Sequence, residues 1–142
     1  MSSHKFLDHT ADVLFQAEAD SINKLFREAA LATFATMTDL ATVEKLESRT
    51  FKIQSNTLEY LLFDFLDELL MYKDAEILFF SDFQINIEET EDHKWKLEAT
   101  CHGEEVQEEK HDRKLVVKAI TLHLFEIKQV EGKWTCQVLL DI

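Results

Sequence analysis

The N-terminal region alternates apolar and polar positions in the manner of a β-strand. Over residues 13–19 one face is apolar and the other mainly polar, and the apolar positions are Val13, Phe15, Ala17 and Ala19. A period of two residues predicts a strand with one buried face. Residues 5–8 precede this segment, so we expect two short strands joined by a turn at residues 9–11.

Apolar residues at helical spacing predict two helices. Residues 21–37 carry the first apolar stripe, which Asp20 or Ser21 can cap. A second helix is expected to start at Asn56, because Glu59 follows three residues later, as in a capping box. Its stripe is the clearest periodicity in the chain and consists of Leu58, Leu61, Leu62, Phe65, Leu66, Leu69 and Leu70. We interpret it as a core-packing face rather than a cofactor-binding or helix-binding face.

Strand periodicity accounts for most of the remaining chain. A strand is expected over residues 49–54 between the helices, and two more, around 83–87 and 95–101, on either side of a turn at 90–93. Residues 115–128 are apolar on both faces for much of their length, which favours a central strand. A turn at Glu131–Gly132 leads into the apolar positions of a last strand, Trp134, Cys136, Val138 and Leu140.

This order of elements indicates an α+β fold. We expect a single two-layer domain over residues 1–142, with two amphipathic helices packed on a mixed, mostly antiparallel sheet. The longest irregular segment is Gly103–Lys114, a charged stretch that begins with a glycine. Long loops often carry function, so it is a candidate functional loop.

The net charge of −13 limits the classes of partner. Binding to a phosphate backbone needs cations, and 15 Lys and Arg stand against 28 Asp and Glu, so direct binding to nucleic acid or to an anionic membrane is disfavoured. A basic protein or a metal cation fits better, although acidity can also serve solubility alone. Cys101 and Cys136 fall at apolar strand positions and are expected to be buried thiols. Together with the absence of an apolar leader segment, they favour the cytoplasm.

The chain lacks the spacings of common catalytic motifs. It contains no P-loop, GxGxxG, HExxH or GxSxG pattern. Its six histidines do not pair at a spacing of four residues on a helix, and two glycines in the whole chain make a phosphate-cradling loop improbable. We therefore do not expect an enzyme that acts by itself.

Two polar sites break the local pattern. The first is the cluster Asp8-His9-Thr10-Ala11-Asp12, whose side chains also suit an ordinary turn. The second is the C-terminus, where an apolar strand runs to the last residues, Asp141 and Ile142, with no polar tail. Chain ends usually fray, so this ending indicates a docked terminus.

The two sites can meet if the N-terminal and C-terminal strands are neighbours in one sheet. Asp12, Asp141 and the free carboxylate of Ile142 would then gather three anionic oxygen ligands. Such a cluster is costly without a cation, and oxygen ligands select a hard divalent ion such as Ca²⁺, Mg²⁺ or Mn²⁺. Lys118 is a further candidate because it is predicted to share an apolar strand face with Ile120, Leu122 and Leu124. It could extend to water from a sheet edge or face the carboxylate cluster or a phosphate.

Taken together, these motifs resemble the archease family over nearly the whole chain. The residues that carry the resemblance are Phe6 to Asp12, Phe34, Met37-Thr38-Asp39, Leu61 to Leu70, Gly103-Glu104, His111, Val117 to Thr121 and Asp141-Ile142. The bulky Val13-Leu14-Phe15 and the Glu- and Lys-rich 103–114 segment depart from the family pattern. Neither departure involves the candidate metal ligands, but both concern the surface that a partner would meet.

The resemblance implies an accessory protein of the RtcB-type RNA ligase. That ligase joins a 2′,3′-cyclic phosphate or 3′-phosphate RNA end to a 5′-hydroxyl with GTP, through a guanylylated histidine. The family resemblance implies that this chain promotes guanylylation and multiple turnover, and that it binds a divalent metal, with Ca²⁺ favoured, at Asp12, Asp141 and Ile142. It also implies functional roles for Lys118, His9 and Asp8.

Two other functions remain open from the sequence. A metal-dependent phosphoesterase would use the carboxylates as its own catalytic site and would cleave a phosphoester without a partner. A general chaperone or binding module would use the acidic surface as a solubilising shield, and Asp12 and Asp141 would not matter to it.

Overall fold

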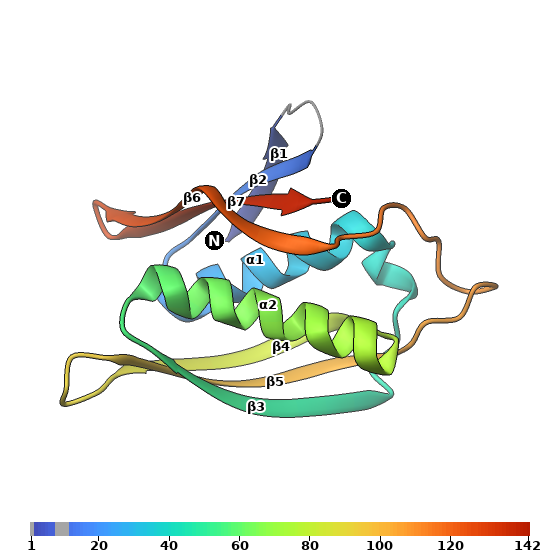
Figure 1. Cartoon of the computed structure of the whole chain (residues 1–142), viewed down its shortest axis with the longest axis horizontal. Helices are drawn as coiled ribbons and strands as arrows, with labels where there is room; N and C mark the ends of the chain where they lie inside the picture. The colour runs from blue at the N-terminus through green and yellow to red at the C-terminus, as the bar shows by residue number, and fades with distance from the viewer. Residues whose placement is uncertain (1, 8–11) are drawn as a thin grey trace.

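A computed structural model describes residues 2–7 and 12–142 (Figure 1). The described chain contains seven strands, two α-helices and one short 3₁₀ helix. In order they are β1 (Ser3–Leu7), β2 (Asp12–Ala19), α1 (Ile22–Met37), η1 (Leu40–Thr42), β3 (Glu47–Ser55), α2 (Leu58–Glu76), β4 (Leu78–Glu89), β5 (Trp95–Glu105), β6 (Ala119–Val130) and β7 (Lys133–Asp141). Neither helix of this described part is long and apolar enough to cross a membrane.

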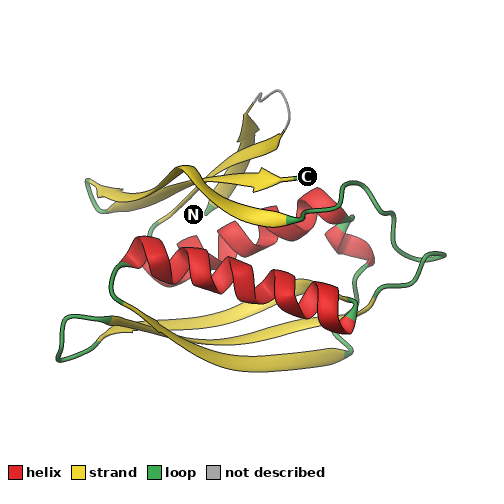
Figure 2. Cartoon of the chain, viewed as in Figure 1, coloured by secondary structure: helices red, strands yellow, loops and turns green. Residues whose placement is uncertain are grey.

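The strands form two sheets, and the helices lie between them (Figures 1 and 2). Sheet A has the order β1-β2-β7-β6 and sheet B the order β3-β5-β4. Every described strand pairing is antiparallel. The predicted α+β class and the packing of two helices on antiparallel strands are confirmed. The strands are divided between two sheets rather than gathered in one, because each helix buries apolar side chains toward both sheets.

Both helices begin at capping side chains that the local sequence supplies. The Ser21 hydroxyl accepts a hydrogen bond from the backbone N–H of Lys24 at 3.2 Å, as expected. In α2 the cap is Thr57, whose hydroxyl accepts from the N–H of Tyr60 at 3.1 Å. The predicted start at Asn56 was therefore wrong by one residue. Ser55, Asn56 and Thr57 are all residue types that cap helices well, and the hydrogen bond to the first turn comes from Thr57.

The core lies between the sheets and is rich in phenylalanine. Phe34 packs edge to face on Phe80, and Phe26 lies against Phe65 of α2. The predicted leucine stripe of α2 is buried from Leu61 to Leu70, as expected of a core face, and Leu58 at its start is partly buried. Both cysteines are also buried, and burial raises the pKa of each thiol to about 12, so they remain protonated.

The strand predicted over residues 115–128 differs in length and position. It begins at Ala119 and forms an edge of sheet A, whereas the inner positions belong to β2 and β7. The β6–β7 pairing is interrupted between Thr121 and Glu126, and the apolar residues of this interruption account for part of the apolar character that the sequence shows on both faces. Lys118 precedes the strand and is exposed, so it does not share a regular strand face with Ile120 and Leu122 as predicted.

Gly103 belongs to β5 rather than to the start of a loop. A Cβ atom on this residue would lie 1.9 Å from the carbonyl oxygen of Phe79, so the backbones of β4 and β5 approach too closely for any other residue. The ladder shifts register at this point, between Phe80 and Asp82. The predicted 103–114 loop therefore starts after Glu105, and the irregular segment continues to Lys118.

Candidate functional site

The two chain ends meet at one end of sheet A. Asp12 of β2 lies directly opposite Asp141 of β7, and Asp141 in turn lies opposite Ala119 of β6. The register thus places the first residue of β2 and the last residue of β7 side by side. The expected neighbourhood of the N-terminal and C-terminal strands is confirmed (Figure 1).

The Asp12 and Asp141 side chains occupy the face of sheet A that is turned away from the helices. Their neighbours Val13 and Leu140 pack against or within the core, and successive side chains of a strand point to opposite faces. Residues directly opposite one another share a face, with Cβ atoms about 4.5–5.5 Å apart. Both side chains are half-buried. Two carboxylates in direct register repel each other, and a cation would relieve that repulsion.

The C-terminal residue is docked rather than frayed. Strand β7 continues through Asp141, and Ile142 packs its partly buried side chain against the hydrophobic core. This contact holds the terminal carboxylate one residue beyond Asp141. The predicted docked ending is therefore confirmed, and its physical basis is the apolar side chain of the last residue.

The main chain ties Lys118 to the same end of the sheet. Its backbone N–H donates a hydrogen bond to the carbonyl oxygen of Asp141 at 2.8 Å. The segment before it is held by α2, since the Lys73 ammonium donates to the carbonyl oxygen of Val117 at 3.0 Å and Val117 is fully buried. The Lys118 side chain is exposed and starts beside Asp141. A cationic side chain is thus carried on a fixed backbone next to the aspartate pair.

The donor set fits a hard divalent cation. Asp12 and Asp141 offer side-chain carboxylates, and Ile142 offers a terminal carboxylate on the adjoining residue. Within residues 2–7 and 12–142, no three Asp, Glu, His or Cys side chains come together in a metal-holding group. The third predicted ligand is the main-chain carboxylate of Ile142, which is not a side chain of this kind. The candidates Asp8 and His9 lie outside the described residues, and the role of all these ligands stays a prediction.

A second polar cluster, which the sequence pattern did not reveal, orders the segment that leads to Lys118. Glu104 and His111 are both buried, and the His111 Nε2 lies 3.2 Å from the Glu104 carboxylate. The same carboxylate accepts from the Lys110 ammonium at 2.8 Å and from the backbone N–H of Glu44 at 2.7 Å. His111 Nδ1 accepts from the Gln107 N–H at 2.9 Å, which leaves Nε2 to donate to Glu104.

These contacts set the charge state of Glu104. Burial by itself would raise its pKa, but the hydrogen bonds from Lys110, the Glu44 N–H and His111 outweigh burial and hold the pKa below its ordinary value. The Glu104 carboxylate contacts Gln107, Lys110 and His111 and so holds both ends of a turn at residues 107–111. The only sequence signal for this pair was that both residues belong to the resemblance, since their separation matches no helix or strand period.

Comparisons with known proteins agree with this architecture. The model of the Archease protein family matches residues 4–142. The chain belongs to the archease family. It is 39% identical over 143 residues to the protein archease of Pyrococcus abyssi, and the match covers 100% of each chain.

Two solved structures share the archease fold of this chain. The solution structure of Methanobacterium thermoautotrophicum protein 1598 matches with a TM-score of 0.87 and 41% identity over 98% of each chain. The crystal structure of an archease, possible chaperone, from Thermotoga maritima matches with a TM-score of 0.63 over 97% of this chain and 96% of that one. At 17% identity the second match concerns the fold alone.

Proposed function

We propose that this chain is a non-enzymatic accessory protein that activates an RtcB-type RNA ligase in the cytoplasm. It promotes guanylylation and multiple turnover of the ligase in tRNA splicing and RNA repair. Membership of the archease family supports the proposal at the level of the family. The observation that carries it to particular residues is the register that sets Asp12 opposite Asp141, with Lys118 bonded to the Asp141 main chain.

The chemistry of this end of sheet A suits a nucleotide-handling partner. Asp12, Asp141 and the terminal carboxylate of Ile142 would hold a divalent cation, with Ca²⁺ favoured and Mg²⁺ or Mn²⁺ as alternatives. Such a cation would neutralise negative charge on phosphate oxygens, and this stabilisation is a main part of phosphoryl-transfer catalysis. The chain as a whole carries a net charge of −13, so a basic phosphate-binding mouth on the ligase would attract it and speed the encounter. Lys118 would present its ammonium group to a phosphate at the same mouth.

A multiple-turnover ligation assay with the cognate RtcB-type ligase tests this proposal. The substrates are an RNA with a 2′,3′-cyclic phosphate, an RNA with a 5′-hydroxyl, and GTP. Wild-type protein should raise the number of products per ligase above one. Asp12→Asn, Asp141→Asn, Lys118→Ala and a chain without Ile142 should lose most of this stimulation, while their far-ultraviolet circular dichroism stays that of the wild type.

Matched controls come from the same molecule. Asp112→Asn removes an exposed carboxylate and Lys128→Ala removes an exposed ammonium group elsewhere on β6, so both should stimulate like the wild type. Equal stimulation by a folded Asp12→Asn variant would contradict the proposal. Absence of stimulation by the wild type, with suppression of aggregation of unrelated proteins, would favour the chaperone function named for the Thermotoga maritima relative. Phosphoester cleavage without the ligase would favour a hydrolase.

A further inference from the structure

The edge strand β6 contains a large bulge close to the candidate site. Between the paired positions Thr121 and Glu126 the strand advances five residues, while β7 advances only two, from Leu139 to Gln137. The four residues Leu122 to Phe125 therefore stand opposite Val138 alone, an excess of three residues on β6. Leu124 adopts a φ of 59°, a left-handed backbone that costs a residue with a Cβ atom roughly 1–2 kcal/mol. The bulge is therefore maintained against a local conformational cost.

Contacts on both sides hold the bulge in place. The Gln137 side-chain amide donates to the carbonyl oxygen of Leu124 at 3.0 Å. Phe125 turns inward and packs edge to face on Phe63 of α2, with ring centroids 6.0 Å apart. Hydrogen bonding of the strained carbonyl and burial of the next side chain make this a formed structure rather than a frayed strand. Bulges of this kind are often features that re-aim a side chain.

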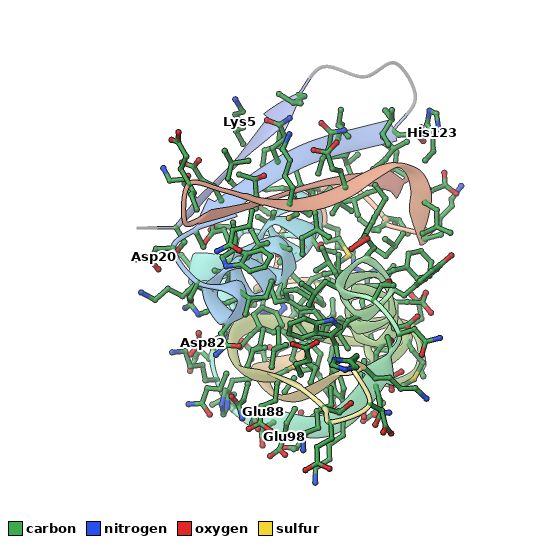
Figure 3. All side chains as sticks on the ribbon, turned by 90° about the vertical axis from the view of Figure 1, so that its left-hand side faces the viewer. Lys5, Asp20, Asp82, Glu88, Glu98 and His123 are labelled. Atoms are coloured by element: carbon green, nitrogen blue, oxygen red, sulfur yellow. The ribbon has the colours of Figure 1, made fainter. Side chains whose placement is uncertain are left out.

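The bulge presents apolar side chains to solvent. Leu122 is 54% exposed and Leu124 is 43% exposed. His123 between them points outward from sheet A (Figure 3). Leu122 is three residues from Ala119, the partner of Asp141, which corresponds to roughly 10 Å along a strand. The two exposed leucines thus lie on the β6 edge of sheet A, toward the end where β6 meets Asp141, whereas Asp12 and Asp141 belong to the inner strands β2 and β7.

We propose that Leu122 and Leu124 form a docking knob that enters an apolar socket on the ligase, beside the mouth that receives Asp12 and Asp141. This inference rests on the proposed function and names the surface that the ligase contacts. A protein interface commonly buries an apolar centre next to charged groups, and a few large side chains carry most of the affinity.

Charge and backbone geometry identify the occupant. A second copy of this chain also carries a net charge of −13 and would be repelled, whereas a basic partner is attracted. Addition of a strand to the β6 edge needs a regular row of backbone groups, and the bulge interrupts that row. The occupant is therefore a basic protein with an apolar socket rather than another copy or an extended peptide strand.

Leu124→Gly separates docking from folding. Glycine adopts a positive φ without strain, so the variant should keep the bulge and a melting temperature within a few degrees of the wild type. Its dissociation constant for the cognate ligase should rise about tenfold, and the same rise is expected for Leu122→Ser. Matched controls are Val130→Ser at the far end of β6 and Leu46→Ser just before β3, at residues that are 52% and 65% exposed in the native chain. Both controls should bind like the wild type.

The outcomes are distinguishable. Unchanged ligase binding by Leu124→Gly and Leu122→Ser, with stimulation lost in Asp12→Asn, would overturn the docking knob and leave the proposed function standing. A wild-type chain that neither binds nor stimulates the ligase would overturn both. A wild-type dimer in sedimentation analysis that Leu122→Ser converts to a monomer would show that the leucines meet a second copy, which also overturns the inference. Equal losses in Val130→Ser and Leu46→Ser would contradict it as well.

Discussion

The two sheets pack on the same pair of helices but differ in regularity. In sheet B, β3 and β5 pair without interruption from Glu47 to Ser55, and the β4–β5 ladder has one short register shift between Phe80 and Asp82. Sheet A has two carboxylates in direct register at one end and a bulge in its edge strand. Sheet B is the more regular of the two. The strands of sheet A and the residues next to them carry every predicted metal ligand that the structure describes, and Lys118.

Cross-strand charges show the same contrast. On sheet B, Lys52 lies opposite Glu98 with a nitrogen-to-oxygen distance of 3.7 Å, and Lys96 lies opposite Glu88 at 3.5 Å. Glu88 and Glu98 appear on the lower, outer side of the molecule in Figure 3. On sheet A, like charges oppose each other at Asp12 and Asp141. Opposite charges in register stabilise a sheet and like charges destabilise it.

The largest effect is expected where sheet B is most tightly packed. Gly103→Ala would drive a Cβ atom to 1.9 Å from the Phe79 carbonyl oxygen, which is backbone and cannot turn aside. We expect a loss of more than about 4 kcal/mol in the free energy of unfolding, or failure to fold. Urea denaturation followed by circular dichroism measures it.

Gly132→Ala provides the control for this prediction. Gly132 has a φ of 79°, but a Cβ atom on this residue would meet no other atom within 4 Å, so only backbone strain opposes the change. The expected loss is about 1 kcal/mol. A Gly103→Ala variant no less stable than Gly132→Ala would mean that the close approach of β4 and β5 is not a constraint.

The sequence predicted the helices and the strand periods well because burial imposes a repeat. The α2 stripe and the alternation of residues 13–19 both result from the burial of one face of the element. The division into two sheets was not predictable in the same way, since a strand has the same pattern whichever sheet it joins. The edge position of β6 was missed because the leucines of its bulge give the same apolar composition as a buried central strand.

The candidate site was also only partly predictable from the sequence. The meeting of Asp12 with Asp141 was inferred from an apolar chain ending, a signal that the docked Ile142 explains physically. The cluster around Glu104 and His111 was not inferred as a contact, because it joins a strand end to a turn and follows no period. Its effect on the 106–118 segment becomes visible only when the hydrogen bonds are known.

The second largest effect concerns that cluster. Glu104→Gln removes a buried charge that Lys110 and His111 contact, so the free energy of unfolding should fall by about 3 kcal/mol at pH 7. The wild type should also lose stability in acid. The folded pKa of Glu104 lies below its ordinary value of 4.5, so the unfolded chain takes up the proton first as the pH falls. This contribution is complete well above pH 4.5 and is lost as the pH drops through the folded pKa.

Urea denaturation at a series of pH values from neutral into the acid range measures both parts of this prediction. Glu104→Gln should show a weaker decline below pH 4.5 than the wild type, because one carboxylate no longer contributes. Glu44→Gln is the matched control, since Glu44 also contacts Lys110 but its side chain is 63% exposed. It should change the free energy of unfolding by less than about 0.5 kcal/mol. Equal effects of the two variants would show that the burial of Glu104 does not matter.

The smallest effect compares the charge pairs of the two sheets directly. Asp141→Asn on sheet A removes one of two like charges and should raise the free energy of unfolding by up to about 1 kcal/mol in a buffer with a chelator. Glu98→Gln on sheet B removes one of two opposite charges and should lower it by a few tenths of a kcal/mol, about the value of an exposed ion pair. The same chemical change thus has opposite signs on the two sheets.

Calcium sharpens this last comparison. A cation that binds the folded wild type raises its melting temperature as its concentration exceeds the dissociation constant, so millimolar Ca²⁺ should stabilise the wild type and Glu98→Gln alike. Asp141→Asn lacks one proposed ligand and should show little response. Differential scanning fluorimetry with Ca²⁺ and with a chelator measures all three proteins together. If Asp141→Asn destabilises the chain in the chelator and still responds to Ca²⁺ like the wild type, the paired aspartates are structural, and sheet A does not lose stability to a metal site.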